Sequence, residues 1–216
     1  MKEVLYQLIY AILGSMGSGK TLSSVILADM LQKKEKNLKI YSNFHIKLPN
    51  AIYTPLLLIP FSELKNAVII ADDIYALANL KALIGIIVNL SRKRSLHIIL
   101  TAQYYTFIPK QIRTLTDFFI FPEFNEGRLF WSVLQNTQIT RIEIRGFQKY
   151  FNLYNTEEIV PFYTDERIKQ EIIKNSNTIE DLDTNLQIAI SNSRKRASIR
   201  KQILSEYADK YIKSVS

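Results

Sequence analysis

The chain has 216 residues, 47% of them hydrophobic, which is enough for one sizeable α/β domain with a small appendage and excludes disordered and fibrous classes. It contains no cysteine, so disulfides, thiolate metal sites and cysteine nucleophiles are excluded. The formal net charge of +8 favours a polyanionic partner, although charge alone does not separate nucleic acid from a membrane surface.

Two apolar stretches need to be tested as targeting or membrane segments. Val4 to Leu13 has the length of a signal-peptide core, but no small-residue cleavage site follows it. Ile74 to Leu90 is interrupted by polar residues and glycine, and falls short of a membrane span. We therefore expect a soluble, intracellular protein that is not secreted and has no stable membrane insertion.

The first predicted strand, Gln7 to Leu13, leads into a glycine-rich segment that fits the pattern G-x-x-x-x-G-K-[ST]. Its members are Gly14, Ser15, Met16, Gly17, Ser18, Gly19, Lys20 and Thr21. A helix is predicted over Thr21 to Lys34, because apolar residues recur there at three- and four-residue spacing. Strand, loop and helix in this order predict a phosphate-binding loop, with Lys20 on the β- and γ-phosphates and Thr21 on Mg²⁺.

Two further strands end in polar residues. Leu38 to Phe44 carries Asn43 at its tip, either as a ligand at the binding edge of an α/β sheet or as a plain turn residue. Ala67 to Ala71 is a continuous apolar run that ends in Asp72 and Asp73. We predict that Asp72 holds Mg²⁺ and that Asp73 is the catalytic base; the alternative for Asp72 is a helix cap.

A helix is predicted over Tyr75 to Ser91, and the basic cluster Arg92, Lys93 and Arg94 follows it. These cations could simply complement the helix dipole. The next strand, Leu96 to Thr101, leads to Gln103, which we predict to bridge the γ-phosphate and its attacking water.

The region that follows is predicted to add antiparallel strands to a parallel core. A short helical segment, Ile108 to Leu115, precedes a strand at Asp117 to Phe121. A turn at Asn125-Glu126-Gly127 then predicts a hairpin into a strand over Arg128 to Leu134, and a strand over Gln138 to Ile144 is predicted to pair next to it. Trp131 is interpreted as a packing residue and not as a nucleotide platform.

The last part of the chain is polar and basic. Thr164 to Lys174 is predicted as a helix, and Asn175 to Asn185 as a loop or a weakly ordered helix start. The stretch from Ser191 is either a DNA-facing basic helix or a solvated helix docked through its apolar residues, Ile199, Ile203, Leu204 and Tyr207. We predict an ATPase domain over residues 1–166 and a basic helical extension over 167–216.

These motifs, in this order, resemble those of the FtsK/HerA superfamily of P-loop ATPases. The likeness covers about Tyr6 to Glu166 and is greatest to the genome-packaging ATPases of membrane-containing icosahedral viruses, of the Sulfolobus turreted type. It implies a RecA-like α/β fold with a mainly parallel sheet flanked by helices. One departure is Asp73, since the family usually has Asp-Glu in the acidic motif and aspartate is a shorter base.

The resemblance implies ATP and Mg²⁺ as cofactors and a homo-oligomeric ring, pentameric or hexameric, that translocates double-stranded DNA. It also implies work in the cytoplasm of a host cell, transiently at a capsid vertex with vertex proteins as partners. Arg92 and Arg94 precede a strand that spans roughly 20 Å, so we predict that they act as fingers on the next subunit. Arg113 is predicted as a finger in cis or a DNA contact. The alternative functions are a phage-type morphogenesis ATPase and a small-molecule P-loop kinase.

Overall fold

The computed structural model describes residues 8–35, 37–60, 62–74, 91, 93–155, 158, 165–190 and 192–215. The predicted helix over Tyr75 to Ser91 therefore lies almost wholly outside the described residues, and Arg92 lies outside them as well. Within the described ranges, no helix combines the length and the apolar character that a membrane crossing requires.

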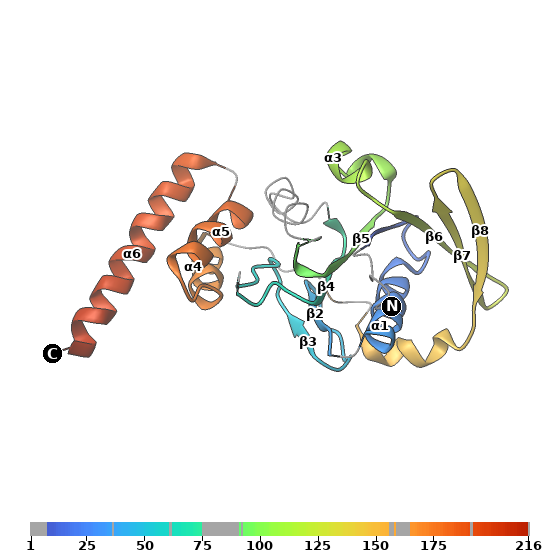
Figure 1. Cartoon of the computed structure of the whole chain (residues 1–216), viewed down its shortest axis with the longest axis horizontal. Helices are drawn as coiled ribbons and strands as arrows, with labels where there is room; N and C mark the ends of the chain where they lie inside the picture. Colours follow the sequence, from blue (N-terminus) through green and yellow to red (C-terminus); the bar gives the residue numbers. More distant parts are fainter. Residues whose placement is uncertain are drawn as a thin grey trace.

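An eight-stranded sheet in the order β3-β2-β4-β5-β1-β6-β7-β8 forms the centre of the molecule (Figure 1). The strands from β3 to β6 are parallel, and β7 and β8 continue the sheet in antiparallel pairs. Their bounds are β1 Ile9–Leu13, β2 Lys39–Ser42, β3 Ala51–Tyr53, β4 Ala67–Ala71, β5 Leu96–Ala102, β6 Phe118–Asn125, β7 Arg128–Gln135 and β8 Gln138–Ile144. This arrangement confirms the predicted parallel core with antiparallel additions at one edge.

The central strands are buried on both faces, which explains their continuous apolar sequences. Every residue of β1, β4 and β5 is buried. The helix α1, Lys20–Lys34, covers one face together with the 3₁₀ segment η3, Phe147–Leu153. Trp131 of β7 is buried there and donates from Nε1 to Ser23 Oγ of α1 at 2.8 Å. The predicted packing role of Trp131 is confirmed.

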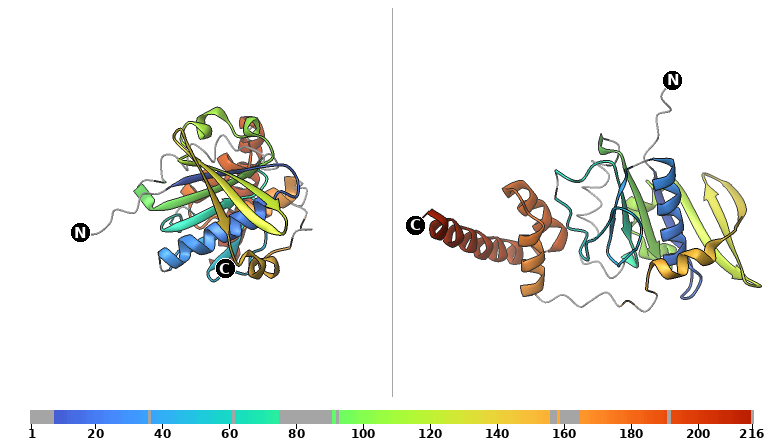
Figure 2. Two further views of the ribbon diagram at one scale, coloured as in Figure 1. Left: turned by 90° about the vertical axis from the view of Figure 1, so that its right-hand side faces the viewer. Right: turned by 90° about the horizontal axis from the view of Figure 1, so that it is seen from below.

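The opposite face packs against a loop and the C-terminal helices. Its apolar cluster includes Leu57 and Leu58 from the loop, Ile112 from the short helix α3, Lys110–Arg113, and several helical residues from beyond position 166. The C-terminal helices are α4 Asp165–Lys174, α5 Ile179–Ala189 and α6 Ser193–Val215. In Figures 1 and 2, α6 projects from the end of the molecule opposite β7 and β8.

Of the two alternatives for Asn175 to Asn185, the loop was wrong, because α5, Ile179–Ala189, begins within this stretch. Thr178 Oγ1 accepts from Asp181 N at 3.0 Å, and Asp181 Oδ2 accepts from Thr178 N at 3.1 Å. These reciprocal bonds form a capping box, which satisfies backbone N–H groups at the helix start. The sequence signal for this helix start was the pattern [ST]-x-x-[DE], which Thr178 to Asp181 fits.

The helix α6 is docked on α5 through apolar side chains. Ile199 and Ile203 are buried, and Arg200 Nε donates to Asp183 Oδ1 of α5 at 2.7 Å. The docked alternative is thus confirmed for the described side chains, while a DNA contact by the exposed basic face stays a prediction. The domain boundary at residue 166 also stays a prediction. Residues on both sides of it belong to one apolar cluster.

Candidate nucleotide-binding site

The glycine-rich loop lies at the carboxyl edge of the parallel strands. It follows β1, and Gly14 N donates to the carbonyl of Ala102, the last residue of β5, at 3.3 Å. Asp72 and Gln103 follow β4 and β5 directly, so they reach the same edge. The fold therefore brings the loop, the acidic pair and the glutamine together, as the order of motifs predicts.

The geometry of the loop requires glycine at position 19 and leaves little space at Gly14. A Cβ atom on Gly14 would lie 2.5 Å from Ser18 Oγ, so a larger residue there would displace that hydroxyl. Gly19 has φ +92°, and a Cβ there would lie 2.7 Å from Cε2 of Phe124. The chain turns from Gly19 directly into α1 through a backbone conformation that other residues rarely adopt.

The start of α1 has the properties of an anion site. Gly19 gives no side-chain cap, and the first turn holds no acidic residue, so its N–H groups and the positive end of the helix dipole are open to an anion. Lys20 is 9% exposed and donates from Nζ to the Ser15 carbonyl at 3.0 Å, which folds it over the loop. The Ser18 hydroxyl is buried without a partner in the described part of the chain and is a further donor. This set of donors fits a phosphate chain.

Asp72 connects the loop to the centre of the sheet. Its Oδ2 accepts from Thr21 Oγ1 at 2.9 Å, so the two predicted Mg²⁺ residues are in contact. Burial raises the pKa of Asp72 to about 6; hydrogen bonds from Thr101 and Thr21 lower it in part, and the nearby Asp73 carboxylate raises it further. A hydroxyl and a carboxylate oxygen side by side fit the preference of Mg²⁺ for oxygen ligands.

The Asn43 side chain forms hydrogen bonds with both polar backbone atoms of Asp72. Its Nδ2 donates to the Asp72 carbonyl at 2.8 Å, and its Oδ1 accepts from Asp72 N at 2.8 Å. The residue is 1% exposed, so these bonds are made away from water. Asn43 at the tip of β2 is therefore neither a plain turn residue nor an exposed ligand; it fixes the position of Asp72.

Thr101 is a site residue to which the sequence analysis gave no role. Its hydroxyl donates to Asp72 Oδ1 at 2.7 Å and accepts from Asp73 N at 2.8 Å. One side chain thus orients the Asp72 carboxylate and the Asp73 backbone, which has a positive φ of 46°. The signal was a single hydroxyl residue near the end of a strand whose other residues, His97 apart, are apolar.

The arginines lie in different places. Arg94 lies two residues before the start of β5, at the edge of the sheet opposite the loop, and its Nη1 donates to the Leu64 carbonyl at 3.5 Å. Arg113 belongs to α3, which follows β5 at the nucleotide edge, and its guanidinium lies 4.6 Å from the centre of the Tyr105 ring. The roles of Asp73, Gln103 and the arginines stay predictions.

One solved structure agrees with this geometry at the level of the fold. The N-terminal domain of zonular occludens toxin from Neisseria meningitidis is 19% identical, with a TM-score of 0.52, and the match covers 69% of this chain and 100% of that domain. The chain has a P-loop NTPase-like fold. The flagellar accessory protein FlaH from Methanocaldococcus jannaschii is 16% identical over 60% of this chain and 79% of its own, with a TM-score of 0.45. No family model matches the chain, and no curated protein matches it.

Proposed function

We propose that this protein is a Mg²⁺-dependent ATPase. The observation that carries the proposal is the 2.9 Å hydrogen bond between Thr21 Oγ1 and Asp72 Oδ2, directly beside Lys20 and the uncapped start of α1. A phosphate chain on this loop would lie against a cation, backbone donors and an oxygen pair for the metal. Each of these groups is needed to stabilise charge in phosphoryl transfer.

The residues at this edge divide the work of hydrolysis. Lys20 and the N–H groups of the loop would bind and orient the phosphates, and Thr21 and Asp72 would hold Mg²⁺. When bound, Mg²⁺ supplies charge neutralisation at the β- and γ-phosphate oxygens. Gln103 would position the attacking water, and Asp73 would accept its proton. Asn43 and Thr101 keep the two aspartates in place.

The test is phosphate release from Mg²⁺–ATP by the unmodified protein and by the Lys20→Ala variant. We expect the rate to fall by at least on the order of 100-fold, because the Lys20 ammonium no longer stabilises the negative charge that develops on the phosphate oxygens. Lys110→Ala, an exposed lysine of α3, is the matched control. Unchanged hydrolysis in Lys20→Ala would overturn the proposal, and phosphorylation of nucleoside acceptors faster than phosphate release would favour a kinase.

The finer proposal is that hydrolysis drives translocation of double-stranded DNA by a ring of subunits, with packaging of a viral genome as the biological task. It is supported by the net charge of +8 and by the FtsK/HerA-like order of motifs. Hydrolysis should rise when duplex DNA is added, and the mass of the particle should be that of a pentamer or hexamer. A rate of hydrolysis that does not change when DNA is added would favour the phage-type morphogenesis ATPase instead.

A further inference from the structure

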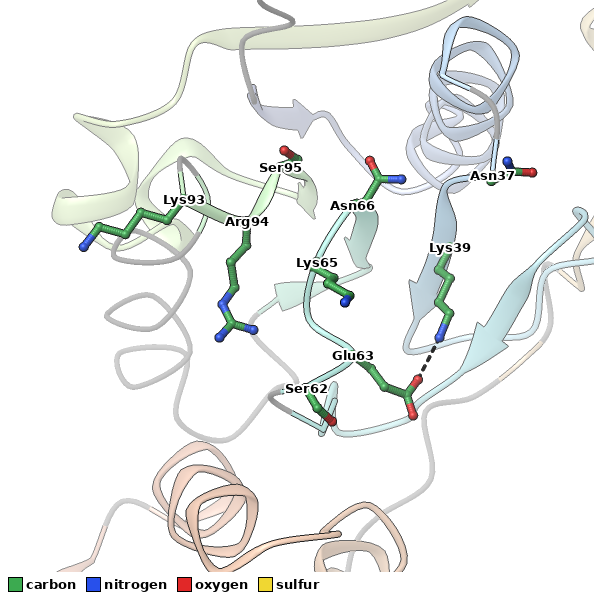
Figure 3. Close-up of a pocket in the computed structure, with 9 residues that line it drawn as sticks. All are labelled: Asn37, Lys39, Ser62, Glu63, Lys65, Asn66, Lys93, Arg94 and Ser95. Carbon is green, nitrogen blue, oxygen red and sulfur yellow. Dashed lines mark hydrogen bonds and ion pairs between the residues drawn. The ribbon is translucent and has the colours of Figure 1, made fainter.

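A basic hollow lies at the edge of the sheet opposite the nucleotide site. It has a volume of about 750 Å³, in the range of ligand pockets, and it is formed where β2, β4 and β5 begin (Figure 3). Its lining residues are Asn37, Lys39, Ser62, Glu63, Lys65, Asn66, Lys93, Arg94 and Ser95. We refer to these nine residues as the basic pocket.

The basic pocket carries four cationic side chains and one carboxylate. Lys39 Nζ lies 3.0 Å from Glu63 Oε2, so one cation is already paired. That lysine is also the main reason why the pKa of Glu63 is lowered, which keeps this carboxylate ionised. The ammonium groups of Lys65 and Lys93 are exposed and have no partner in the described part of the chain. The pocket thus has an excess of positive charge, which a bound anion would stabilise.

The polar surroundings of these cations suit phosphate groups. Asn37, Ser62 and Asn66 offer amide and hydroxyl donors around the same hollow, and all three are exposed. Hydrogen bonds to phosphate oxygens from lysine, serine and asparagine are typical of contacts that position a protein on a nucleic-acid backbone without reading its bases. An open hollow at an edge can receive a long polyanion, whereas a closed cavity would select a small one.

The pocket is separate from the nucleotide site but connected to it by three strands. β2 joins Lys39 to Asn43, β4 joins Asn66 to Asp72, and β5 joins Ser95 to Thr101. A strand of seven residues spans roughly 20 Å, so a ligand in the pocket does not touch a nucleotide on the same subunit's loop. Each strand that reaches the acidic site nevertheless begins at the pocket.

We infer that the basic pocket binds the phosphodiester backbone of duplex DNA, through Lys65 and Lys93. The inference rests on the proposed function, because it names the surface that a DNA-dependent ATPase would use. It predicts contacts that are independent of base sequence and sensitive to salt.

The experiment measures binding of a fluorescently labelled DNA duplex at several salt concentrations, with the full chain and with the Lys65→Ala/Lys93→Ala variant. Each lost phosphate contact lowers the slope of log Kd against log salt by about 0.9, so we expect the slope to fall by about two and affinity to fall at every salt concentration. Lys65→Arg/Lys93→Arg should retain binding. The charge-matched control is Lys110→Ala/Lys174→Ala, which removes two exposed lysines outside the pocket and should keep the original slope.

Four results would overturn the inference. Equal weakening by the pocket and control variants would mean diffuse attraction without a site. A fall in DNA-free hydrolysis with DNA binding unchanged would mean that the pocket receives nucleotide phosphates from a neighbouring subunit. Absence of duplex binding by the unmodified protein at low salt would remove the DNA part of the proposed function as well, whereas binding that survives in the pocket variant removes this inference alone.

Discussion

At the scale of single residues, the site depends on side chains that hold the aspartates in place. Asn43 directly follows β2 and pairs with both polar backbone atoms of Asp72. Thr101 lies on β5, on the other side of β4, and pairs with the Asp72 carboxylate. Asp72 is therefore fixed from both neighbouring strands, which leaves its Oδ2 atom facing Thr21.

Replacement of Asn43 by alanine should weaken both stability and catalysis. It leaves the N–H and carbonyl of Asp72 unpaired in a buried place, at a cost of about 2 kcal/mol in unfolding free energy. We also expect slower hydrolysis with a higher Mg²⁺ requirement, because the carboxylate is less well placed. Chemical denaturation and Mg²⁺ titrations measure the two effects. Asn152→Ala, an exposed asparagine of η3, should change neither; an Asn43→Ala protein with unaltered Mg²⁺ dependence would argue against the positioning role.

The raised pKa of Asp72 predicts how nucleotide binding depends on pH. The pKa of about 6 lies above the ordinary value of 3.8. Without ligand, the folded protein therefore favours the protonated carboxyl more than the unfolded chain does. This contribution to stability is fully present below pH 3.8 and is lost as pH rises through about 6. Metal binding needs the ionised form, so affinity for a Mg²⁺–nucleotide should decrease as pH falls through about 6.

Two variants test the assignment of this titration to Asp72. Thr101→Val removes a hydrogen bond that lowers the pKa, so the midpoint of the affinity curve should move to higher pH. Asp72→Asn should bind Mg²⁺–nucleotide weakly at every pH. As pH rises from about 4 to 7, the unfolding free energy of this variant should increase relative to that of the unmodified protein. The measurements are calorimetric titration and denaturation across that range. Identical midpoints for Thr101→Val and the unmodified protein would assign the titration to another group.

At the scale of elements, the capping box shows how a few polar atoms start a helix. Thr178→Ala removes the side-chain acceptor at the start of α5 and should lower the unfolding free energy by about 1 kcal/mol. Thr178→Ser keeps the acceptor and is the control. The expected result is a lower midpoint of thermal or chemical unfolding for alanine and little change for serine. Equal stability of all three proteins would show that packing of Leu182 and Leu186 alone forms the helix.

The elements that the sequence predicts well are those with one dominant signal. β4 coincides with the apolar run Ala67 to Ala71, because a strand buried on both faces needs no polar alternation. The hairpin of β6 and β7 follows from its Asn-Glu-Gly turn. β3 was missed because three residues between prolines show no period, and within the described residues β3 pairs with β2 alone. β6 runs four residues past the predicted Phe121 because β7 pairs with it as far as Asn125.

The candidate site was predictable in part for a related reason. The loop and Asp72 have a motif or a strand end to mark them, so the sequence places them correctly at one edge. Asn43 and Thr101 act through contacts with Asp72, which lies 29 residues from each of them. Such contacts depend on the order β2-β4-β5 in space, and spacing along the chain does not reveal it.

At the scale of the whole molecule, the two proposed binding sites lie at opposite edges of the sheet. The nucleotide edge holds the loop and Asp72, and the opposite edge holds Arg94 and the basic pocket. Arg94 and the loop are separated by the length of β5, roughly 20 Å, which an arginine side chain does not span. If Arg94 acts on ATP, it must act on the nucleotide of a neighbouring copy, and this edge would then face that copy's loop in place of DNA.

This geometry leads to a prediction about mixed assemblies. A guanidinium always carries charge and can contact two oxygens of the γ-phosphate, so loss of a finger should slow hydrolysis on the order of 10³-fold with little change in nucleotide affinity. Arg92→Ala/Arg94→Ala and Lys20→Ala proteins should each be inactive alone. When they are mixed, some interfaces pair an intact loop with intact arginines, and phosphate release should partly recover. Co-assembly is verified by pull-down with two different tags. Assemblies that contain both variants and still show no hydrolysis would mean that these arginines do not act between subunits, and Arg113, at the nucleotide edge, would then be the residue to replace.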